Sequence, residues 1–208
     1  MKHSQILQGV EQFFSNKVNR FGATPEGLDY NSRQAQEVRF EQFLRLFDHS
    51  TAFSLIDYGC GYGALAHFLR ERGFSFQYHG FDISEAMIAH ARKVAPEGQG
   101  WNFYSDPAHL LPADYTVACG IFNLKLETDV DVWKEYILDT LNSLAGLSKL
   151  GFGFNILTSY SDKDRMRPDL YYGDPLFFFD HCKSRFSRNV ALLHDYGLYD
   201  WTILVRLT

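Results

Sequence analysis

One short segment, residues 55–63 with the sequence LIDYGCGYG, combines a carboxylate with glycine at every second later position. Glycine has no Cβ, so its backbone can approach a ligand closely and can adopt positive φ. Between a strand and a helix N-terminus, such a turn can hold an adenosine-bearing ligand. Gly59, Gly61 and Ala64 fit the G-x-G-x-x-G/A pattern of dinucleotide-binding enzymes, so a nicotinamide-dependent oxidoreductase is one candidate function.

The aspartate at position 57 favours a different ligand. In the dinucleotide pattern this position is normally apolar and faces the core. A carboxylate there would repel a nearby pyrophosphate, and it would attract a ligand that carries a positive charge. S-adenosylmethionine carries a sulfonium and an α-amino group and has no phosphate. Asp57 therefore favours S-adenosylmethionine over a dinucleotide.

The segment LIDYGCGYGALAHFL resembles the first motif of the class I S-adenosylmethionine-dependent methyltransferases, D/E-x-G-x-G-x-G. The resemblance implies that Asp57 engages the amino group of the cofactor, directly or through water. It also implies that the turn formed by Gly59, Cys60 and Gly61 lies under the methionyl part. The likeness extends over roughly residues 50–208 at the level of fold.

A second carboxylate, Asp82, ends the next predicted strand. At that strand end it can accept hydrogen bonds from both ribose hydroxyls. The segment GFDISEAMIAHARK resembles the family's second motif, which implies that Ile83 and Met87 lie near the adenine or the ribose. The alternative role of Asp82 is to cap the following helix, a position for which Ser84 is already well suited.

Two later segments extend the resemblance. In YSDP, Asp106 follows the third strand, where the family often contacts the adenine amino group, although a simple turn residue fits equally well. The segment DYTVACGIFN resembles the fourth-strand motif. That likeness implies that the residues from Cys119 to Phe122, Gly120 included, lie under the cofactor.

Residues 1–50 are predicted to form an N-terminal helical cap. The sequence NSRQAQEVRFEQFLRLFD places Val38, Phe43 and two later apolar residues on one side at helical spacing. Tyr30 and Arg39 belong to this portion and are candidates to cover the cofactor. An aromatic face attracts a sulfonium, and an arginine can pair with the methionyl carboxylate.

Residues 51–208 are predicted to form the methyltransferase domain, within a single compact domain overall. Strand-like and helix-like segments alternate from about residue 52, which indicates an α/β fold. We expect a Rossmann-like, doubly wound, mostly parallel sheet of seven strands with a C-terminal antiparallel hairpin that turns at residues 195–197. Right-handed crossovers bring the carboxyl ends of the parallel strands to one edge, where ligands bind.

The methyl acceptor is predicted to be a small molecule. The fourth strand ends in GIFNLKLE, which differs from the Asn/Asp-Pro-Pro-aromatic motif of methyltransferases that act on exocyclic amines of bases or on glutamine amides. The polar segment 159–175 follows the fifth strand and therefore reaches the ligand edge. Within it Tyr171 and Tyr172 are candidates to line an acceptor pocket, and Arg165 and Arg167 are candidates to meet an acidic substrate; a solvated loop is the alternative.

No catalytic base is evident in the sequence. His181, His194 and Tyr172 are candidates, and a base is needed only if the acceptor loses a proton during attack. The histidines show no metal-ligand spacing, so no metal is expected. A protein that binds S-adenosylmethionine or S-adenosylhomocysteine without methyl transfer is an alternative function, because fold alone does not establish catalysis.

Composition limits the partners. The chain has 208 residues, a formal net charge of −5 and a pI near 5.9, and no basic run, so neither nucleic acid nor an anionic membrane is expected as the main partner. The three cysteines, an odd number without a CxxC pair, favour a reducing, cytoplasmic location over a disulfide framework. Neither a secretory signal nor an apolar run long enough to span a membrane is apparent.

Overall fold

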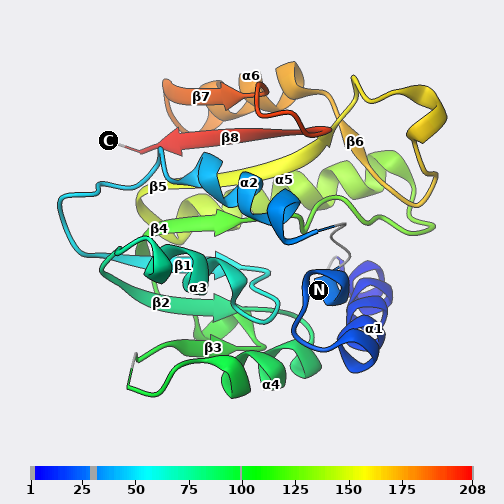
Figure 1. The fold of residues 1–208 in the computed structure, drawn as a ribbon. Coiled ribbons are helices and arrows are strands. Elements are labelled where there is room, and N and C mark those ends of the chain that lie inside the picture. The colour runs from blue at the N-terminus through cyan, green and yellow to red at the C-terminus, as the bar shows by residue number, and fades with distance from the viewer. Residues whose placement is uncertain (1–2, 29–31, 99, 208) are drawn as a thin grey trace.

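The computed structural model describes residues 3–28, 32–98 and 100–207, and its centre is one mixed β-sheet (Figure 1). Its main path has the strand order β3-β2-β1-β4-β5-β8-β7. The β1 strand pairs in parallel with β2 and β4, whereas β8 runs antiparallel to β5 and β7. The strands are β1 (Phe53–Tyr58), β2 (Phe76–Phe81), β3 (Asn102–Tyr104), β4 (Ala113–Ala118), β5 (Ser148–Thr158), β6 (Tyr172–Gly173), β7 (Asn189–Leu193) and β8 (Asp200–Arg206).

The predicted fold class is confirmed, with one additional strand. The two residues of β6 pair in parallel with the carboxyl end of β5, off the main path of seven strands. The indole of Trp201 holds this short strand, because its Nε1 donates a hydrogen bond of 3.0 Å to the carbonyl of Gly173. A two-residue strand has no periodicity of its own, so the sequence pattern did not predict it.

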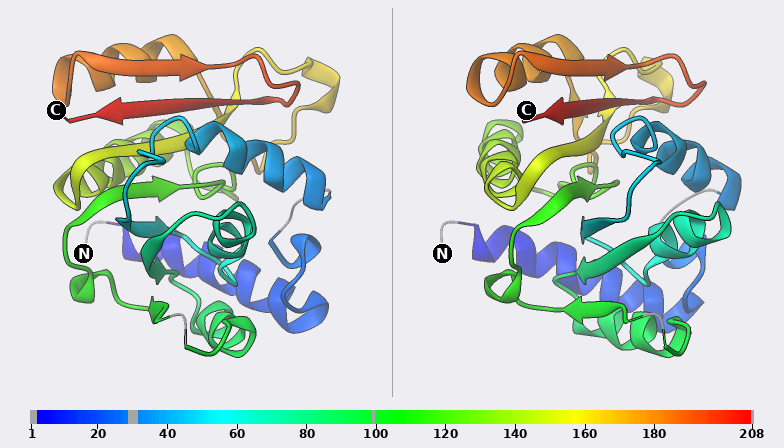
Figure 2. Two further views of the ribbon diagram at one scale, coloured as in Figure 1. Left: turned by 60° about the vertical axis from the view of Figure 1, so that its left-hand side comes forward. Right: turned by 90° about the vertical axis from the view of Figure 1, so that its left-hand side faces the viewer.

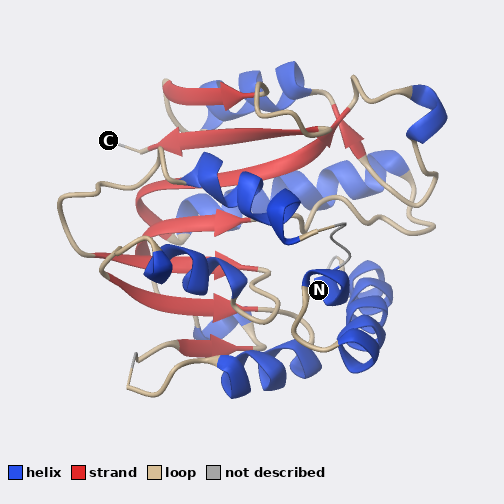
Figure 3. Ribbon diagram, viewed as in Figure 1, coloured by secondary structure: helices blue, strands red, loops and turns tan. Residues whose placement is uncertain are grey.

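Helices cover both faces of the sheet (Figures 2 and 3). Residues of α2, α3 and α4 share one apolar cluster with Leu55 and Val117 of the sheet, whereas α5 and α6 contribute to a second cluster with Phe152 and Phe154. These are the two layers of a doubly wound fold. The helices are α1 (Ser4–Phe21), α2 (Arg33–Phe43), α3 (Ala64–Glu71), α4 (Glu85–Val94), α5 (Val130–Gly146) and α6 (Pro175–Arg185), with short 3₁₀ turns at η1 (Pro25–Leu28), η2 (Pro107–His109) and η3 (Lys163–Arg165).

Alternation of phenylalanine and glycine in β5 sets how closely α2 packs on the sheet. Phe152 and Phe154 face the α5 side, where both side chains are fully buried. A Cβ added at Gly153 would lie 2.9 Å from the Phe43 ring of α2. Because glycine has no Cβ, the α2 helix can lie directly against the strand. This close packing holds the end of α2 against the middle of β5.

The second N-terminal helix is shorter than the sequence predicts. The expected periodic segment continues to residue 48, but α2 ends at Phe43, after which Leu44 and Leu46 donate to carbonyls only three residues earlier. Leu46 and Phe47 are still buried, so their apolar spacing reflects core packing beyond the helix end. Among the residues that the structure describes, no helix combines the length and apolarity needed to cross a membrane.

The first helix lies across the open edge of the sheet. Figure 1 places α1 at the end toward which the arrowheads of β1, β2 and β4 point. Val10 is buried against the second apolar cluster, and Ile6, Leu7 and Phe14 pack beside it. The Ser15 hydroxyl forms a hydrogen bond of 2.7 Å with the Ser84 hydroxyl at the start of α4. The edge where ligands of this fold class bind is therefore partly covered by the N-terminal helix.

Candidate functional site

The glycine turn between β1 and α3 has the conformation that its sequence predicts. The φ angles of Gly59, Gly61 and Gly63 are +86°, +53° and +84°, a region that costs residues with a Cβ about 1–2 kcal/mol. The backbone N–H groups of Gly59 and Cys60 donate hydrogen bonds of 2.7 and 2.8 Å to the carbonyl of Phe81. These bonds join the turn to the end of β2, so the carboxyl ends of β1 and β2 are held in a fixed position relative to one another.

Side chains lie directly on this turn. A Cβ at Gly59 would come within 2.1 Å of the Ile121 side chain, and a Cβ at Gly61 within 2.4 Å of Leu28. Ile121 follows β4, and Leu28 belongs to the η1 turn after α1. Glycine at both positions therefore allows segments from distant parts of the chain to approach the turn.

Asp57 is a buried carboxylate at the end of β1. Only 3% of its surface is exposed, and its Oδ2 accepts a hydrogen bond of 2.7 Å from the Tyr78 hydroxyl. Burial raises the pKa of Asp57 to about 7; the Tyr78 bond opposes this rise, and the nearby charge of Asp82 adds to it. A cation bound beside Asp57 would favour the ionised form.

Asp82 uses its two carboxylate oxygens to organise the turn. Oδ2 accepts from the N–H of Gly61 at 2.9 Å, and Oδ1 accepts from the N–H of Ser84 at 2.9 Å. The predicted cap of α4 is confirmed as Ser84, whose hydroxyl accepts from the N–H of Met87. Burial raises the pKa of Asp82 to about 6, and the two backbone hydrogen bonds lower it. The carboxylate remains half-buried.

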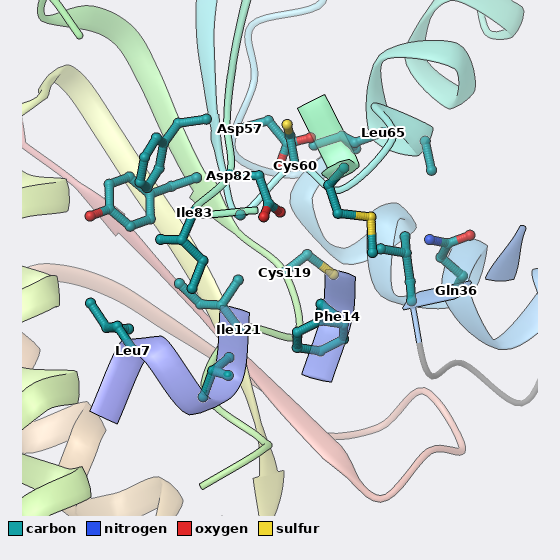
Figure 4. Close-up of a pocket in the computed structure, with 18 of the residues that line it drawn as sticks. Leu7, Phe14, Gln36, Asp57, Cys60, Leu65, Asp82, Ile83, Cys119 and Ile121 are labelled. Carbon is teal, nitrogen blue, oxygen red and sulfur yellow. The ribbon is translucent and has the colours of Figure 1, made fainter. Parts of the chain in front are cut away.

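These groups surround a cavity of about 90 Å³, which we name the glycine-turn cavity (Figure 4). Figure 4 shows the carboxylates of Asp57 and Asp82 on neighbouring strand ends, with Cys119 and Ile121 close by. Sequence-predicted residues that line it are Asp57, Gly59, Cys60, Asp82, Ile83, Met87, Cys119 and Gly120. Ala64 of the glycine motif and Ile121 of the fourth-strand motif line it as well. Lining residues that the sequence did not indicate are Leu7, Val10, Phe14, Leu28, Gln36, Phe40, Tyr58, Leu65, Phe81, Trp133 and Tyr136.

A detectable signal existed for the missed residues of α1. Leu7, Val10 and Phe14 recur at spacings of three and four, which is typical of one helix face. Nothing local indicated that this face would pack at the carboxyl edge of a sheet. The contribution of Trp133 and Tyr136 depends equally on where α5 lies.

Several predicted site residues lie elsewhere. Asp106 is exposed, does not line the cavity, and accepts from the N–H of Ala108 at 2.9 Å as the cap of η2. Phe122 is fully buried in the core beside Phe154, with its carbonyl accepting from the Trp133 indole at 2.8 Å. Gly61 forms the turn, but Leu28 covers it. Tyr30 lies outside the described residues.

The structure pairs Arg39 with the buried side chain of Asp200. The Arg39 guanidinium donates to one oxygen of Asp200 and, through a second nitrogen, to the carbonyl of Ala35 at 2.8 Å. Asp200 has no exposed surface, and burial raises the pKa of its carboxyl, while Arg39 lowers it. Arg39 does not line the glycine-turn cavity, so its location does not support the predicted pairing with a methionyl carboxylate.

A second cavity of about 570 Å³ adjoins the first, and we name it the arginine cavity. It shares Phe14, Leu28 and Gly120 with the glycine-turn cavity. It lies at the carboxyl ends of β4 and β5, beneath the loop that follows β5. Its further lining residues are Ala35, Arg39, Asn123, Leu124, Leu157, Ser161, Arg165, Arg167, Leu170, Tyr172, Gly197, Leu198 and Tyr199.

The polar segment 159–175, which was expected to line an acceptor pocket, contributes some side chains to this cavity and others to the core. Arg165, Arg167 and Tyr172 line the arginine cavity, as the sequence suggested. Tyr171 is instead a core residue with 5% exposure, packed against Phe178, and burial raises the pKa of its hydroxyl to about 12. The sequence makes both tyrosines candidates because their polar segment follows β5 at the ligand edge. Tertiary packing decides which of the two faces the cavity, and it buries Tyr171 against Phe178.

The two cavities differ in the ligands that they suit. No Lys or Arg occurs among the described residues that line the glycine-turn cavity, whereas Asp57 and Asp82 supply two carboxylates there. This arrangement suits a ligand with an amino group and hydroxyls, held among aliphatic and aromatic walls, and opposes a pyrophosphate. The candidate bases His181 and His194 line neither cavity, but Tyr172 lines the second.

Comparisons with known proteins agree with this geometry. Residues 55–144 match a family model described as a methyltransferase domain. A Mycobacterium tuberculosis protein named "Putative methyltransferase Rv1506c" is 48% identical over 164 residues, which cover 78% of this chain and 98% of that protein.

Solved structures share the fold at lower identity. Magnesium protoporphyrin IX methyltransferase from Synechocystis PCC 6803, with bound S-adenosylmethionine, has a TM-score of 0.57 at 16% identity, covering 84% of this chain and 79% of its own. An S-adenosylmethionine-dependent methyltransferase from Clostridium acetobutylicum has a TM-score of 0.57 at 14% identity, covering 94% and 98%. The buried acidic residue before a glycine turn, the mixed sheet and the close relative lead to one conclusion: this chain belongs to the class I S-adenosylmethionine-dependent methyltransferases.

Proposed function

We propose that this methyltransferase binds S-adenosylmethionine in the glycine-turn cavity and methylates a small molecule held in the arginine cavity. The observation that carries this proposal is the volume and position of the arginine cavity. At about 570 Å³, it falls within the range of roughly 300–1,000 Å³ that is usual for small-ligand sites. It adjoins the glycine-turn cavity at Gly120, so an acceptor and a cofactor would meet there.

The lining residues suit the parts of the cofactor. Asp57 would pair with the amino group, and Asp82 would accept hydrogen bonds from the ribose hydroxyls while it holds the turn. Ile83 and Met87 would contact the adenosine moiety through apolar surface. Bound S-adenosylmethionine supplies a methyl group on a sulfonium, which passes to the acceptor as the electron pair of the C–S bond moves to sulfur.

The contribution of the chain to catalysis would be orientation and exclusion of water. Phe14 and Leu28 line both cavities and would keep solvent from the point where they meet. Of the three candidate bases, only Tyr172 lines the arginine cavity, and its hydroxyl already accepts a hydrogen bond of 2.9 Å from the N–H of Arg167. We infer that an acceptor that is nucleophilic without losing a proton suits this site best.

The size of the acceptor can be tested directly. A cell extract is separated into a low-molecular-weight fraction and a macromolecular fraction, and each is incubated with the protein and S-adenosylmethionine. We expect S-adenosylhomocysteine to form with the low-molecular-weight fraction only. The Asp57→Asn variant serves as the matched control for methyltransferases carried over from the extract.

Two other outcomes would contradict the proposal. Turnover confined to the macromolecular fraction would identify a protein or nucleic-acid acceptor and reject the small-molecule assignment. Tight S-adenosylmethionine binding without turnover in either fraction would support a binding protein without transferase activity.

Entry of the cofactor should require movement of the N-terminal cap. The glycine-turn cavity of about 90 Å³ is well below the roughly 300 Å³ at the lower end of ligand sites. Phe14, Leu28 and Ile121 line it, and the last two lie directly against Gly61 and Gly59. If opening precedes binding, the observed rate constant in stopped-flow experiments should level off as S-adenosylmethionine concentration rises. Trp133 lines the cavity, so its fluorescence should change when the cofactor binds.

The side chain of Phe14 offers a specific check on this movement. Phe14→Ala should raise the limiting rate constant, because opening of the cap would then expose less apolar surface to water. Trp133→Phe should abolish the fluorescence change, which would show that Trp133 is its source. A rate constant that rises linearly with cofactor concentration in both proteins would show that the cavity is already accessible.

A further inference from the structure

The arginine cavity carries a charge pattern that the methyltransferase family does not by itself explain. Three arginines, Arg39, Arg165 and Arg167, line it. Among its described lining residues there is no aspartate or glutamate. The carboxylates that pair with these arginines approach from outside the lining. The described lining therefore carries three positive side chains and no negative one.

The loop that carries two of these arginines is held in place on several sides. The N–H of Arg167 donates to the Tyr172 hydroxyl at 2.9 Å, and its guanidinium contacts both oxygens of Asp169, with the Nε bond at 3.1 Å. The carbonyl of Asp169 accepts from the N–H groups of Lys125 and Leu126, each at 3.0 Å. Arg167 is therefore positioned by bonds to the loop after β4, without the need to order a mobile chain on binding.

The other exposed arginine lies beside an aromatic ring. The guanidinium of Arg165 is 5.9 Å from the centre of the Tyr199 ring, and its Nε is 3.9 Å from an Asp162 oxygen. The Tyr199 hydroxyl donates to the same Asp162 side chain. The Arg165 side chain remains two-thirds exposed, so much of its donor capacity faces solvent at the mouth of the cavity.

The neighbouring cavity strengthens the preference for an anion. If the proposed function holds, a cofactor with a positive sulfonium lies beyond Gly120, at the boundary of the two cavities. An acceptor with a negative group would be attracted by both the sulfonium and the guanidinium groups. Arginine is also the side chain that best matches the planar geometry of carboxylates and phosphates.

We propose that the methyl acceptor carries an anionic group, a carboxylate or a phosphate, which Arg165 and Arg167 bind at the mouth of the arginine cavity. The acceptor's nucleophilic atom then points inward, toward Gly120 and the cofactor. The inference rests on the proposed function because it assigns the charge of that same acceptor.

The experiment titrates the full-length protein, saturated with S-adenosylhomocysteine, with inorganic phosphate and separately with benzoate. Arginine Nε–H resonances report binding, and ionic strength is kept constant because salt screens such contacts. We expect one probe to bind saturably. The combined Arg165→Gln and Arg167→Gln substitutions should weaken it about tenfold or more, the loss expected when charged hydrogen bonds are removed.

Arg185→Gln is the matched control. Arg185 lies on α6, is exposed, and does not line the arginine cavity, so its replacement removes one arginine charge, as each of the two test substitutions does, without changing the proposed site. Its affinity for the probe should stay within about twofold of that of the wild type. If the double variant does not fold, Arg165→Gln alone provides the test, because Arg165 is exposed and its ion pair is long.

The outcomes separate this inference from the proposed function. Saturable phosphate binding indicates a phosphate-bearing acceptor, and benzoate binding indicates a carboxylate. If neither probe binds, or if the arginine variants bind equally well, the inference is wrong while S-adenosylhomocysteine binding leaves the methyltransferase site intact. If S-adenosylhomocysteine itself fails to bind, the proposed cofactor site is wrong, whatever the probes do.

Discussion

Replacement of Asp57 by asparagine should weaken S-adenosylmethionine binding by about 2–5 kcal/mol, or roughly thirty-fold to several thousandfold. Asparagine keeps the size and the hydrogen-bonding position next to Tyr78, so the packing of β1 against β2 should survive. It removes the negative charge that would pair with the cofactor's amino group in a buried site. Calorimetric titration of wild type and variant measures the difference.

The pH dependence gives a second signature of Asp57. Because burial raises its pKa to about 7, the free protein holds a proton there at lower pH and must release it to bind a cation. Affinity should fall about tenfold per pH unit below about 7. It should also fall above about 8, where an α-amino group loses its charge. In the Asp57→Asn variant the affinity should no longer fall as the pH drops below 7. Only the weaker pH dependence caused by Asp82, whose pKa is about 6, should remain.

Stability should change in the opposite direction to affinity. The pKa of Asp57 is raised in the folded state, so between about pH 4 and 7 the folded state binds more protons than the unfolded state. The wild-type unfolding free energy therefore loses a contribution as pH rises through this window. Asparagine does not ionise, so its burial causes no such loss of stability. At pH 8 the unfolding free energy of the variant should exceed that of the wild type by on the order of 2–4 kcal/mol.

Two comparisons make the Asp57 result specific. Asp82→Ala should cost a smaller 1–3 kcal/mol of cofactor binding, about the loss expected when polar groups are left unpaired. Tyr78→Phe removes a hydrogen bond that lowers the pKa of Asp57, so the pH step should move upward. If Asp57→Asn binds S-adenosylmethionine as tightly as the wild type, Asp57 has only a structural role in the turn.

Replacement of Arg39 by methionine should lower the unfolding free energy by about 3–5 kcal/mol, because it leaves a buried carboxylate without its cation. Asp200 has no exposed surface, and Arg39 is only 12% exposed, so little water can solvate the remaining charge. Methionine preserves most of the apolar stem of the side chain. Urea unfolding at pH 8, with both midpoint and slope recorded, provides the measurement.

The double variant with Asp200→Asn is the control for this pair. With both charges removed, most of the loss should be recovered, as is common when a buried ion pair is replaced as a unit. The sign of the pH effect also follows. Arg39 lowers the pKa of Asp200, so its removal raises that pKa, and the destabilisation should shrink in acid, where Asp200 takes up a proton. Equal losses at pH 5 and pH 8 would contradict this account.

The conformation of the glycine turn could be predicted from contiguous residues alone. Gly59 and Gly61 adopt the positive φ angles that their pattern requires, and Ser84 caps α4 as its hydroxyl and position predict. These features depend on contiguous residues, because backbone sterics and short-range hydrogen bonds act within a few positions. The alternation of strands and helices could also be predicted from the sequence, and so could the antiparallel pair of strands at its C-terminal end.

The distant side chains that complete the two cavities could not be predicted in this way, because they meet only in the folded chain. Arg39 meets Asp200 across 161 positions of the chain, and Leu28 of the η1 turn covers Gly61. Neither contact leaves a local signature, because it depends on how α1 and α2 pack against the sheet. The fourth-strand motif made Phe122 a candidate ligand contact, and the polar segment after β5 made Tyr171 one. Packing buries both side chains in the core. Side-chain direction at a strand end follows from which face the surrounding helices bury, and that is a property of the assembled fold.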